Sequence, residues 1–262
     1  MAKTDSNEEI AKRIRKFLGI SLPFKNKAAY GGKSYRYYRD IIEDKGIIVE
    51  QIEKVDISEM RGLSISYDIF PIIAINKADY DNAKTFSLFH ELAHIIRRSS
   101  SLCSIDLNDA DDEEEKACDS LAAEILMPRT EFMTLAHNLI FANGRFKENG
   151  LKNLAEMFGV SIIAAFRRLW DLKLINNDFY FKKYLEIKTD FESIENQIKA
   201  RRKSEDIRIP YHIRFVNTHG ILIPKMVLGA YSNGRISVGE TCQLLSVKSK
   251  HIENITRMVM VR

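Results

Sequence analysis

The sequence predicts an α+β fold in which a small antiparallel sheet is followed by a series of helices. The hydrophobic residues alternate with a period of two in three short segments between residues 46 and 76, and they follow the helical period before and after these segments. The composition, with 45% hydrophobic and 29% charged residues among 262, is that of a globular protein. A chain of this length can bury a substantial core, either in one domain with appendages or in two small domains.

The first elements along the chain are two helices and three strands. Residues 8–18 carry Ile10, Ile14 and Leu18 at helical spacing, and residues 35–44 show a second helical pattern. The expected strands cover residues 46–52, 62–67 and 71–76, and they are bounded by Gly, Pro and Asp. We expect an antiparallel sheet directly before the next helix.

That next helix carries the most informative motif, His90-Glu91-Leu92-Ala93-His94. Residues four apart share a helical face, so His90 and His94 can bind one metal ion while Glu91 lies at the rim as a general base. Asp81 and Asn82 are suitable N-caps for a helix whose apolar surface contains Phe86, Phe89, Leu92, Ala93 and Ile96. The alternative is a chance match between two ordinary histidines, which occurs in on the order of one chain in a hundred.

A catalytic zinc ion needs a third protein ligand and one open position. A second helical stretch, residues 112–127, places Glu115 and Asp119 on a face that continues inward through Ala122 and Leu126, and Pro128 ends it. Glu115 could bind the ion, and Asp119 could accept a hydrogen bond from the free nitrogen of a ligand histidine. The neighbouring residues 109–114 form an acidic run, which is most simply a solvated helix start, with residues 112–114 turned toward water.

These segments together resemble the ImmA/IrrE family of metallopeptidases. The HExxH box is followed by a second motif that starts at Glu115 and ends in Ala-Ala-Glu-Ile-Leu-Met-Pro128, and the resemblance extends over roughly two thirds of the chain. Asp119 stands where the family usually has Asn, Leu121 where it has Phe, and Cys118 where it has Ala. The resemblance implies a zincin-like fold, with His90, His94 and Glu115 as zinc ligands and Glu91 as the base.

The expected chemistry follows from a zinc ion in this site. Zinc lowers the pKa of its bound water toward about 7, Glu91 takes the proton as the water attacks a peptide carbonyl, and the carboxyl group then protonates the leaving nitrogen. A further donor usually stabilises the oxyanion. The sequence offers His137, Tyr180 and other tyrosines for that role without deciding among them.

The strand before the metal-binding helix has two interpretations. If it borders the cleft, an extended substrate could pair with its backbone, and Ile73, Ala74 and Asn76 would then be the residues that hold the substrate strand. An ordinary internal strand explains the same pattern equally well.

Residues 154–169 resemble a helix-turn-helix, with Ala155, Gly159 at the turn and Ser161 as the cap of the second helix. The start of that second helix is mostly apolar. We therefore favour a packing role for this unit over DNA contact.

The last part of the chain is basic, with 15 Lys and Arg against 8 Asp and Glu from residue 181 onward. It includes a second helix-turn-helix-like segment, residues 236–247, similar to tails found in the same family. We predict three regions: a metallopeptidase domain at 1–145, a helical region packed on it at 146–180, and a basic extension at 181–262.

Three cysteines without a CxxC spacing, Cys103, Cys118 and Cys242, indicate free thiols in a reducing compartment, and Cys118 is expected in the core. The chain has neither a membrane-spanning segment nor a signal peptide, which predicts a cytoplasmic protein.

The functional prediction is a zinc endopeptidase. By resemblance, its substrate would be a helix-turn-helix repressor or an antitoxin-type regulator. The alternative is a non-proteolytic regulator or antitoxin that binds DNA or a toxin partner through a silent or structural metal site. The presence of Glu91 favours the peptidase, because a structural site does not need a base. A general cytoplasmic peptidase is a further alternative, and the two helix-turn-helix-like units and the basic tail favour a dedicated regulatory partner over it.

Overall fold

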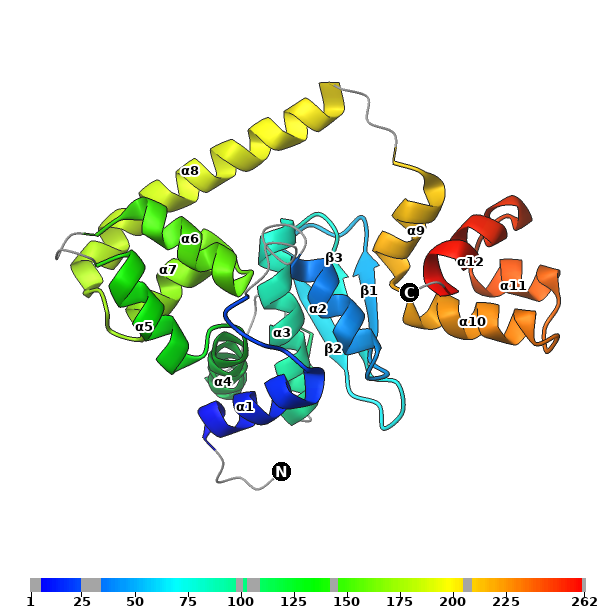
Figure 1. Cartoon of the computed structure of the whole chain (residues 1–262), viewed down its shortest axis with the longest axis horizontal. Coiled ribbons are helices and arrows are strands. Elements are labelled where there is room, and N and C mark those ends of the chain that lie inside the picture. The colour runs from blue at the N-terminus through cyan, green and yellow to red at the C-terminus, as the bar shows by residue number, and fades with distance from the viewer. Residues whose placement is uncertain are drawn as a thin grey trace.

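The structure is a computed structural model that describes residues 6–24, 34–97, 101–102, 109–141, 146–204 and 209–260. Its elements form two units, each with its own cluster of buried apolar side chains. The larger unit contains the sheet and α1 to α7, and the smaller one contains α9 to α12 (Figure 1). The α+β fold class expected from the sequence is confirmed.

The sheet contains β1 (Ile48–Ile52), β2 (Gly62–Ile65), β3 (Ile72–Asn76) and β4 (Ser101–Leu102), in the order β1-β3-β2-β4. Strand β2 pairs antiparallel with both β3 and β4, whereas β1 runs parallel to β3. The prediction of a purely antiparallel sheet is therefore wrong. The reason is topological: β1 and β2 run in opposite directions and β3 inserts between them, so β3, which is antiparallel to β2, runs parallel to β1.

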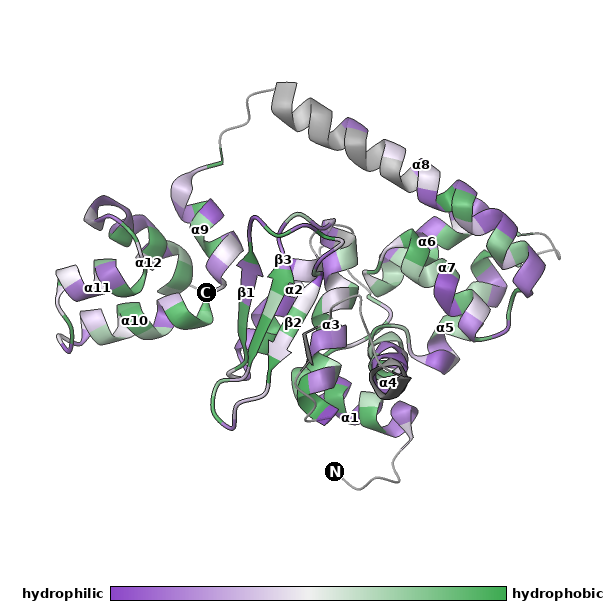
Figure 2. Ribbon diagram, turned by 180° about the vertical axis from the view of Figure 1, so that it is seen from behind, coloured by the Kyte–Doolittle hydropathy of each residue, from purple (hydrophilic) through white to green (hydrophobic). Residues whose placement is uncertain are grey.

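Strand β3 is internal, because β1 pairs along one of its edges and β2 along the other. Four of its five residues are buried, and its green colour in Figure 2 shows its apolar character. Because both edges of β3 are paired, Ile73, Ala74 and Asn76 cannot hold a substrate strand. The structure therefore agrees with the second interpretation, an ordinary internal strand. Asn76 instead uses its side-chain amide to donate to the carbonyls of Val55 and Met60, which fixes the loop before β2.

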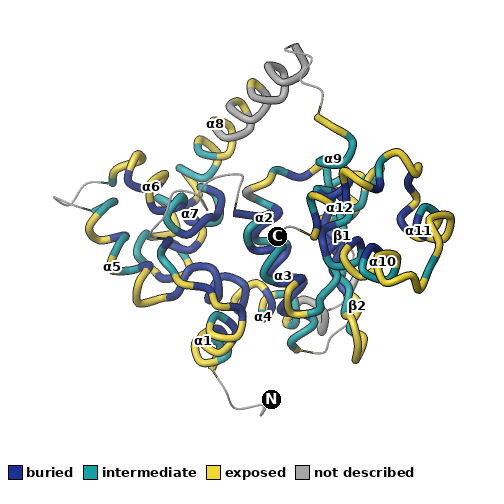
Figure 3. The backbone as a smooth tube through the Cα atoms, turned by 45° about the vertical axis from the view of Figure 1, so that its right-hand side comes forward, coloured by how far each residue is buried: buried dark blue, intermediate teal, exposed yellow. Residues whose placement is uncertain are grey.

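Helices α2 (Ser34–Glu43) and α3 (Asp81–Arg97) pack against the sheet, α2 on β1 and α3 on β2 and β3. They lie in the middle of the molecule and carry many of its buried residues (Figure 3). Helix α1 (Asn7–Leu18) starts with a capping box between Ser6 and Glu9 and ends at Gly19 in the left-handed conformation. It packs against α4 (Asp109–Leu126), where the Arg15 guanidinium donates to the Glu124 carbonyl at 2.6 Å.

Helices α5 (Arg129–Leu139), α6 (Glu148–Phe158) and α7 (Ile162–Asp171) complete the larger unit. The α6–α7 turn requires Gly159, whose φ is +64° and whose added Cβ would lie 2.7 Å from the Phe24 ring. Phe158, Phe166 and Leu169 are fully buried in the main core. The helix-turn-helix-like unit is thus packed into the larger unit, and residues 146–180 share a hydrophobic core with residues 1–145.

Helix α8 (Asn177–Ser204) leaves this core and runs toward the smaller unit (Figure 1). Its start is held by aromatic contacts, since the Tyr180 ring stacks on Phe166 and on Trp170 with centroids 5.3 and 4.7 Å apart. None of the helices in the described part of the chain combines the length and apolar character that a bilayer crossing requires.

The smaller unit consists of α9 (Tyr211–His219), α10 (Leu222–Ser232), α11 (Val238–Leu244), a 3₁₀ turn (Ser249–His251) and α12 (Ile252–Met260). The segment expected to resemble a second helix-turn-helix forms α11 and the turn before α12, and a capping box between Ser237 and Glu240 starts α11. Helix α9 packs on β1, so this unit covers the edge of the sheet that β1 provides.

Candidate metal centre

Helix α3 places His90 and His94 one turn apart on the side that faces α4. Its other side, including Leu88, Phe89 and Ala93, is fully buried in the core, which fixes the rotation of the helix. The His94 side chain is 1% exposed and that of His90 is 12% exposed. The core packing of α3 therefore presents both imidazoles to one small space.

Helix α4 supplies Glu115 to the same space. One carboxylate oxygen of Glu115 lies 3.0 Å from Nε2 of His90, the other lies 3.2 Å from Nε2 of His94, and the two Nε2 atoms are 3.1 Å apart. These three residues form a group whose ligand atoms all lie within 4.8 Å of one another. Such a convergence of nitrogen and oxygen lone pairs needs protons or a metal cation between the atoms.

The three donors fit a zinc ion in type and in spacing. Zinc binds His nitrogen and carboxylate oxygen at about 2.0–2.2 Å, so two ligand atoms of a tetrahedral site lie roughly 3.3 Å apart. The three separations of 3.0, 3.1 and 3.2 Å come close to this value. Three protein ligands also leave one position open, as in catalytic sites.

Asp119 lies one turn after Glu115 and holds the outer nitrogen of His90. Its Oδ1 is 2.8 Å from His90 Nδ1, so Nδ1 carries a hydrogen when Nε2 is a ligand, and this hydrogen is donated to Asp119. A carboxylate in this position fixes the tautomer and the ring orientation of a metal-binding histidine. The geometry is the one that we expected from the Glu115-x-x-x-Asp119 spacing.

Cys118 occupies the equivalent position beside His94. Its Sγ lies 3.4 Å from His94 Nδ1, and the side chain is fully buried. The expectation that Cys118 is a core residue holds, but its contact with a candidate ligand was missed. Its position three residues after Glu115, on the same face of α4, was the available signal.

Glu114 joins the ends of α3 and α4. Its carboxylate accepts two hydrogen bonds from the Arg97 guanidinium, at 2.6 and 2.7 Å. Glu114 was expected to turn toward water; its side chain is 31% exposed and pairs with Arg97 at the end of α3. The bidentate pair stabilises the packing of the two helices that carry the ligands.

Glu91 lies next to the ligands on α3 and is 1% exposed. It packs against Gly62, the first residue of β2: a Cβ added to Gly62 would lie 2.7 Å from Glu91 Oε1 and 3.0 Å from its Cγ. This space exists only because residue 62 has no side chain. The sequence analysis did not identify Gly62, because this residue belongs to no recognisable motif.

The two histidines differ in their protonation equilibria. Burial lowers the pKa of His90, but the carboxylates of Asp119, Glu91 and Glu115 outweigh it, and the net shift is upward. The pKa of His94 is lowered by burial and by its neighbour His90. The three carboxylates around His90 thus favour a positive charge there, and they would favour a bound cation for the same reason.

The oxyanion donors that the sequence offered pack against other aromatic side chains. The Tyr180 ring is stacked between Phe166 and Trp170, and His137 on α5 lies against Phe141 with centroids 6.1 Å apart. The described contacts give neither residue a role beside Glu115.

The fold and this site together define a metallopeptidase-like domain. Residues 45–169 match the Peptidase_M78 family, described as the IrrE N-terminal-like domain. This match confirms the resemblance to the ImmA/IrrE family for residues 45–169. The matched segment contains the four strands, α3 to α6 and all but the last two residues of α7, and with them every candidate ligand.

Other comparisons add little. A search of curated proteins gave no match. Among solved structures, the chain is similar to a Mycobacterium tuberculosis transcriptional regulator, with a TM-score of 0.40 and 16% identity over 62% of this chain. The match spans 46% of the length of that regulator.

Proposed function

We propose that this protein is a zinc-dependent endopeptidase. The observation that carries the proposal is the convergence of His90, His94 and Glu115, three donors of the types zinc prefers, beside a buried Glu91. The match of residues 45–169 to a peptidase family supports the proposal, because this segment contains all four residues.

In the proposed mechanism His90, His94 and Glu115 would hold the metal, which would supply Lewis-acid polarisation of a water molecule and of the scissile carbonyl. Glu91 would take a proton from the attacking water as general base and return it to the leaving nitrogen. Asp119 holds the His90 ring through Nδ1, and Cys118 contacts the corresponding nitrogen of His94.

The proposed substrate is a DNA-binding repressor or an antitoxin-type regulator, as the resemblance to the ImmA/IrrE family implies. The proposed place of action is the cytoplasm, because Cys118 and Cys242 are free thiols, which persist in a reducing compartment. A toxin partner or direct DNA binding belongs to the alternative, non-proteolytic function.

The test combines metal analysis with cleavage. We expect about one zinc ion per chain in the wild type and its loss in His90→Ala. A repressor or antitoxin encoded beside this gene is then incubated with wild type and with Glu91→Gln. Cleavage by the wild type alone is the expected result. Glu113→Gln is the matched control, because Glu113 is an exposed carboxylate near Glu115 on α4.

The two readouts separate the alternatives. A protein without zinc would overturn the proposed site. Zinc in the wild type with equal cleavage by Glu91→Gln would remove Glu91 as the base. Tight binding of the regulator or of DNA without any cleavage would favour the non-proteolytic function.

A further inference from the structure

A pocket of about 780 Å³ opens beside the candidate metal centre. Asp119, whose carboxylate contacts the outer nitrogen of His90, is one of its lining residues, so the pocket reaches the residue that holds this candidate ligand. Its walls come from α3, α4 and α7, with Arg61 before β2 and the start of α1 at its border. This volume lies within the range of small-ligand and peptide pockets and accommodates a few residues of an extended chain.

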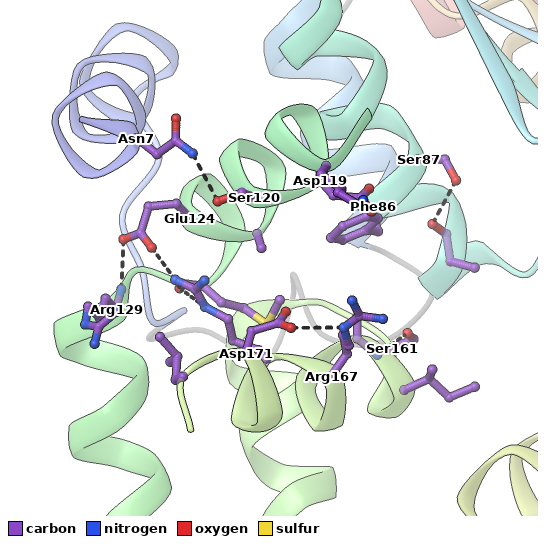
Figure 4. A pocket seen from close by; sticks show the side chains of 18 of the residues that line it. Asn7, Phe86, Ser87, Asp119, Ser120, Glu124, Arg129, Ser161, Arg167 and Asp171 are labelled. Carbon is purple, nitrogen blue, oxygen red and sulfur yellow. Dashed lines mark hydrogen bonds and ion pairs between the residues drawn. The ribbon is translucent and has the colours of Figure 1, made fainter. Parts of the chain in front are cut away.

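The second helix of the helix-turn-helix-like unit forms one wall of this pocket. Ala165, Phe166 and Leu169 of α7 are fully buried in the core, while Ile163, Ala164, Arg167 and Arg168 line the pocket. Figure 4 shows Arg167 and Asp171 on α7 across the pocket from Phe86 and Asp119. This face of α7, which joins Ile163 and Ala164 with Arg167, Arg168 and Asp171, therefore borders the same pocket as Asp119.

The lining of the pocket combines an apolar floor with a charged border. The buried Ala123, Met127 and Leu172 lie at the floor, and Phe86 adds an aromatic wall. The buried Arg168 is neutralised by Glu124 and also donates to the Met127 carbonyl at 2.9 Å. This ion pair fixes the floor and leaves little charge there for a ligand.

Basic groups predominate at the border. Five basic and four acidic side chains line the pocket. Glu124 pairs with Arg168 and Asp171 pairs with Arg167, and outside these two pairs the lining has Arg61, Lys116 and Arg129 against Glu8 and Asp119. The Arg167 side chain is 57% exposed, its Nε pairs with Asp171 at 3.0 Å, and its guanidinium carbon lies over the Trp170 ring, 4.7 Å from the centroid. An exposed arginine that is pre-oriented in this way is suited to bind a carboxylate through two parallel hydrogen bonds.

We propose that α7 selects the substrate, and that this pocket binds an extended peptide segment next to the scissile bond. An apolar side chain of the segment enters the floor of Ala123, Met127 and Leu172, and an Asp or Glu side chain pairs with Arg167. This inference rests on the proposed peptidase function and deepens it by naming the class of sequence that is bound. The inference also gives the helix-turn-helix-like unit formed by α6 and α7 a role other than DNA contact.

The test measures peptide binding without cleavage. Zinc-loaded full-length Glu91→Gln is applied to an array of short unstructured peptides in which every position is varied. The expected preference is an acidic residue at one fixed distance from an apolar one. Adding Arg167→Glu should lower binding of acidic peptides roughly tenfold and shift the preference at that position to Lys or Arg. Arg167→Lys should keep the acidic preference with weaker binding.

The matched control is Lys152→Glu, which makes the same kind of charge change at an exposed position of α6 outside the pocket. It should leave the preference unchanged. An array without an acidic preference, or one whose preference survives Arg167→Glu, would overturn the inference. Binding is measured separately from cleavage. If the acidic peptides bind and the wild type hydrolyses none of them, the proposed pocket stands and the proposed peptidase function fails.

Discussion

At the scale of single residues, the candidate metal centre depends on atoms that would not touch the metal. His90 can point Nε2 at a cation because Asp119 holds Nδ1 at 2.8 Å, and Glu115 reaches both imidazoles because the core fixes α3 and α4. Helical spacing determines which side chains share a face. Their exact direction is determined by such contacts behind the ligands.

The first prediction concerns Asp119. Asp119→Ala should weaken zinc affinity roughly 10- to 100-fold, because the His90 ring loses the acceptor that fixes its tautomer. Asp119→Asn should lose less, since an amide oxygen still accepts from Nδ1. A competition titration with a coloured zinc chelator measures both. Ser120→Ala is the control on the neighbouring position, and equal affinities for all three variants would contradict the role of Asp119.

The second prediction concerns Gly62. Gly62→Ala places a Cβ within 2.7 Å of Glu91 Oε1, so the carboxylate must move away from its position. We expect the rate constant of cleavage to fall roughly hundredfold, with zinc content unchanged, because the base is displaced and the ligands are not. Gly229→Ala is the matched control, since no atom lies within 4 Å of its added Cβ. A normal rate in Gly62→Ala would show that Glu91 tolerates the shift.

Sequence reasoning identified the residues whose roles follow from local spacing. His90, Glu91 and His94 share one turn, and Glu115 and Asp119 share another, so each set could be recognised without the fold. Gly62 lies in a strand 29 positions before Glu91, and its role depends on how β2 packs against α3. Such a contact leaves no periodic signal in the sequence.

At the scale of elements, the three strands before α3 could be predicted, but their pairing could not. Alternation of apolar residues identifies a strand, while the direction of its neighbour depends on the path of the connection. The continuous apolar run from Ile72 to Ile75 was the available signal for a strand enclosed on both sides. Reading it in that way would have excluded a substrate strand at Ile73 and Ala74.

The third prediction concerns the contact between α4 and α7. The Arg168 and Glu124 side chains are 7% and 9% exposed and form a buried ion pair. Arg168→Met leaves the Glu124 carboxylate buried without its partner, and should lower the free energy of unfolding by about 3–5 kcal/mol. Urea unfolding measures this change.

The neighbouring arginine provides the matched comparison. Arg167 pairs with Asp171 at a surface position, where the side chains are 57% and 36% exposed. Arg167→Met should therefore change the free energy of unfolding by about 0.5 kcal/mol or less. Similar losses in both variants would show that burial does not distinguish the two ion pairs.

At the scale of the whole molecule, the smaller unit is held to the larger one through the end of α2. The buried Glu43 carboxylate accepts hydrogen bonds from the backbone N–H groups of Ile221 and Leu222, at 2.9 and 3.3 Å. Gly220 permits this approach, because its φ is +68° and an added Cβ would lie 2.1 Å from Glu43 Oε1. A charged group at the start of α10 therefore connects the two cores.

The last prediction is that this connection weakens as the pH rises. Burial raises the pKa of Glu43 from 4.5 to about 7, although Arg39 and the two N–H groups oppose the shift. Because the folded pKa lies above the unfolded one, the folded protein binds more protons, and this contribution to stability is fully present below about pH 4.5 and is lost as the pH passes 7.

The full shift corresponds to roughly 3 kcal/mol. Glu43→Gln cannot titrate, so its unfolding free energy should lose less than that of the wild type between about pH 5 and pH 8. The measurement is urea unfolding at both pH values, with hydrogen exchange of the α10 amides to locate the change. Glu253→Gln, an exposed carboxylate on α12, is the control. If wild type and Glu43→Gln share one pH dependence, the proton is not bound at the contact between the two units, and Arg39 compensates the buried charge at every pH.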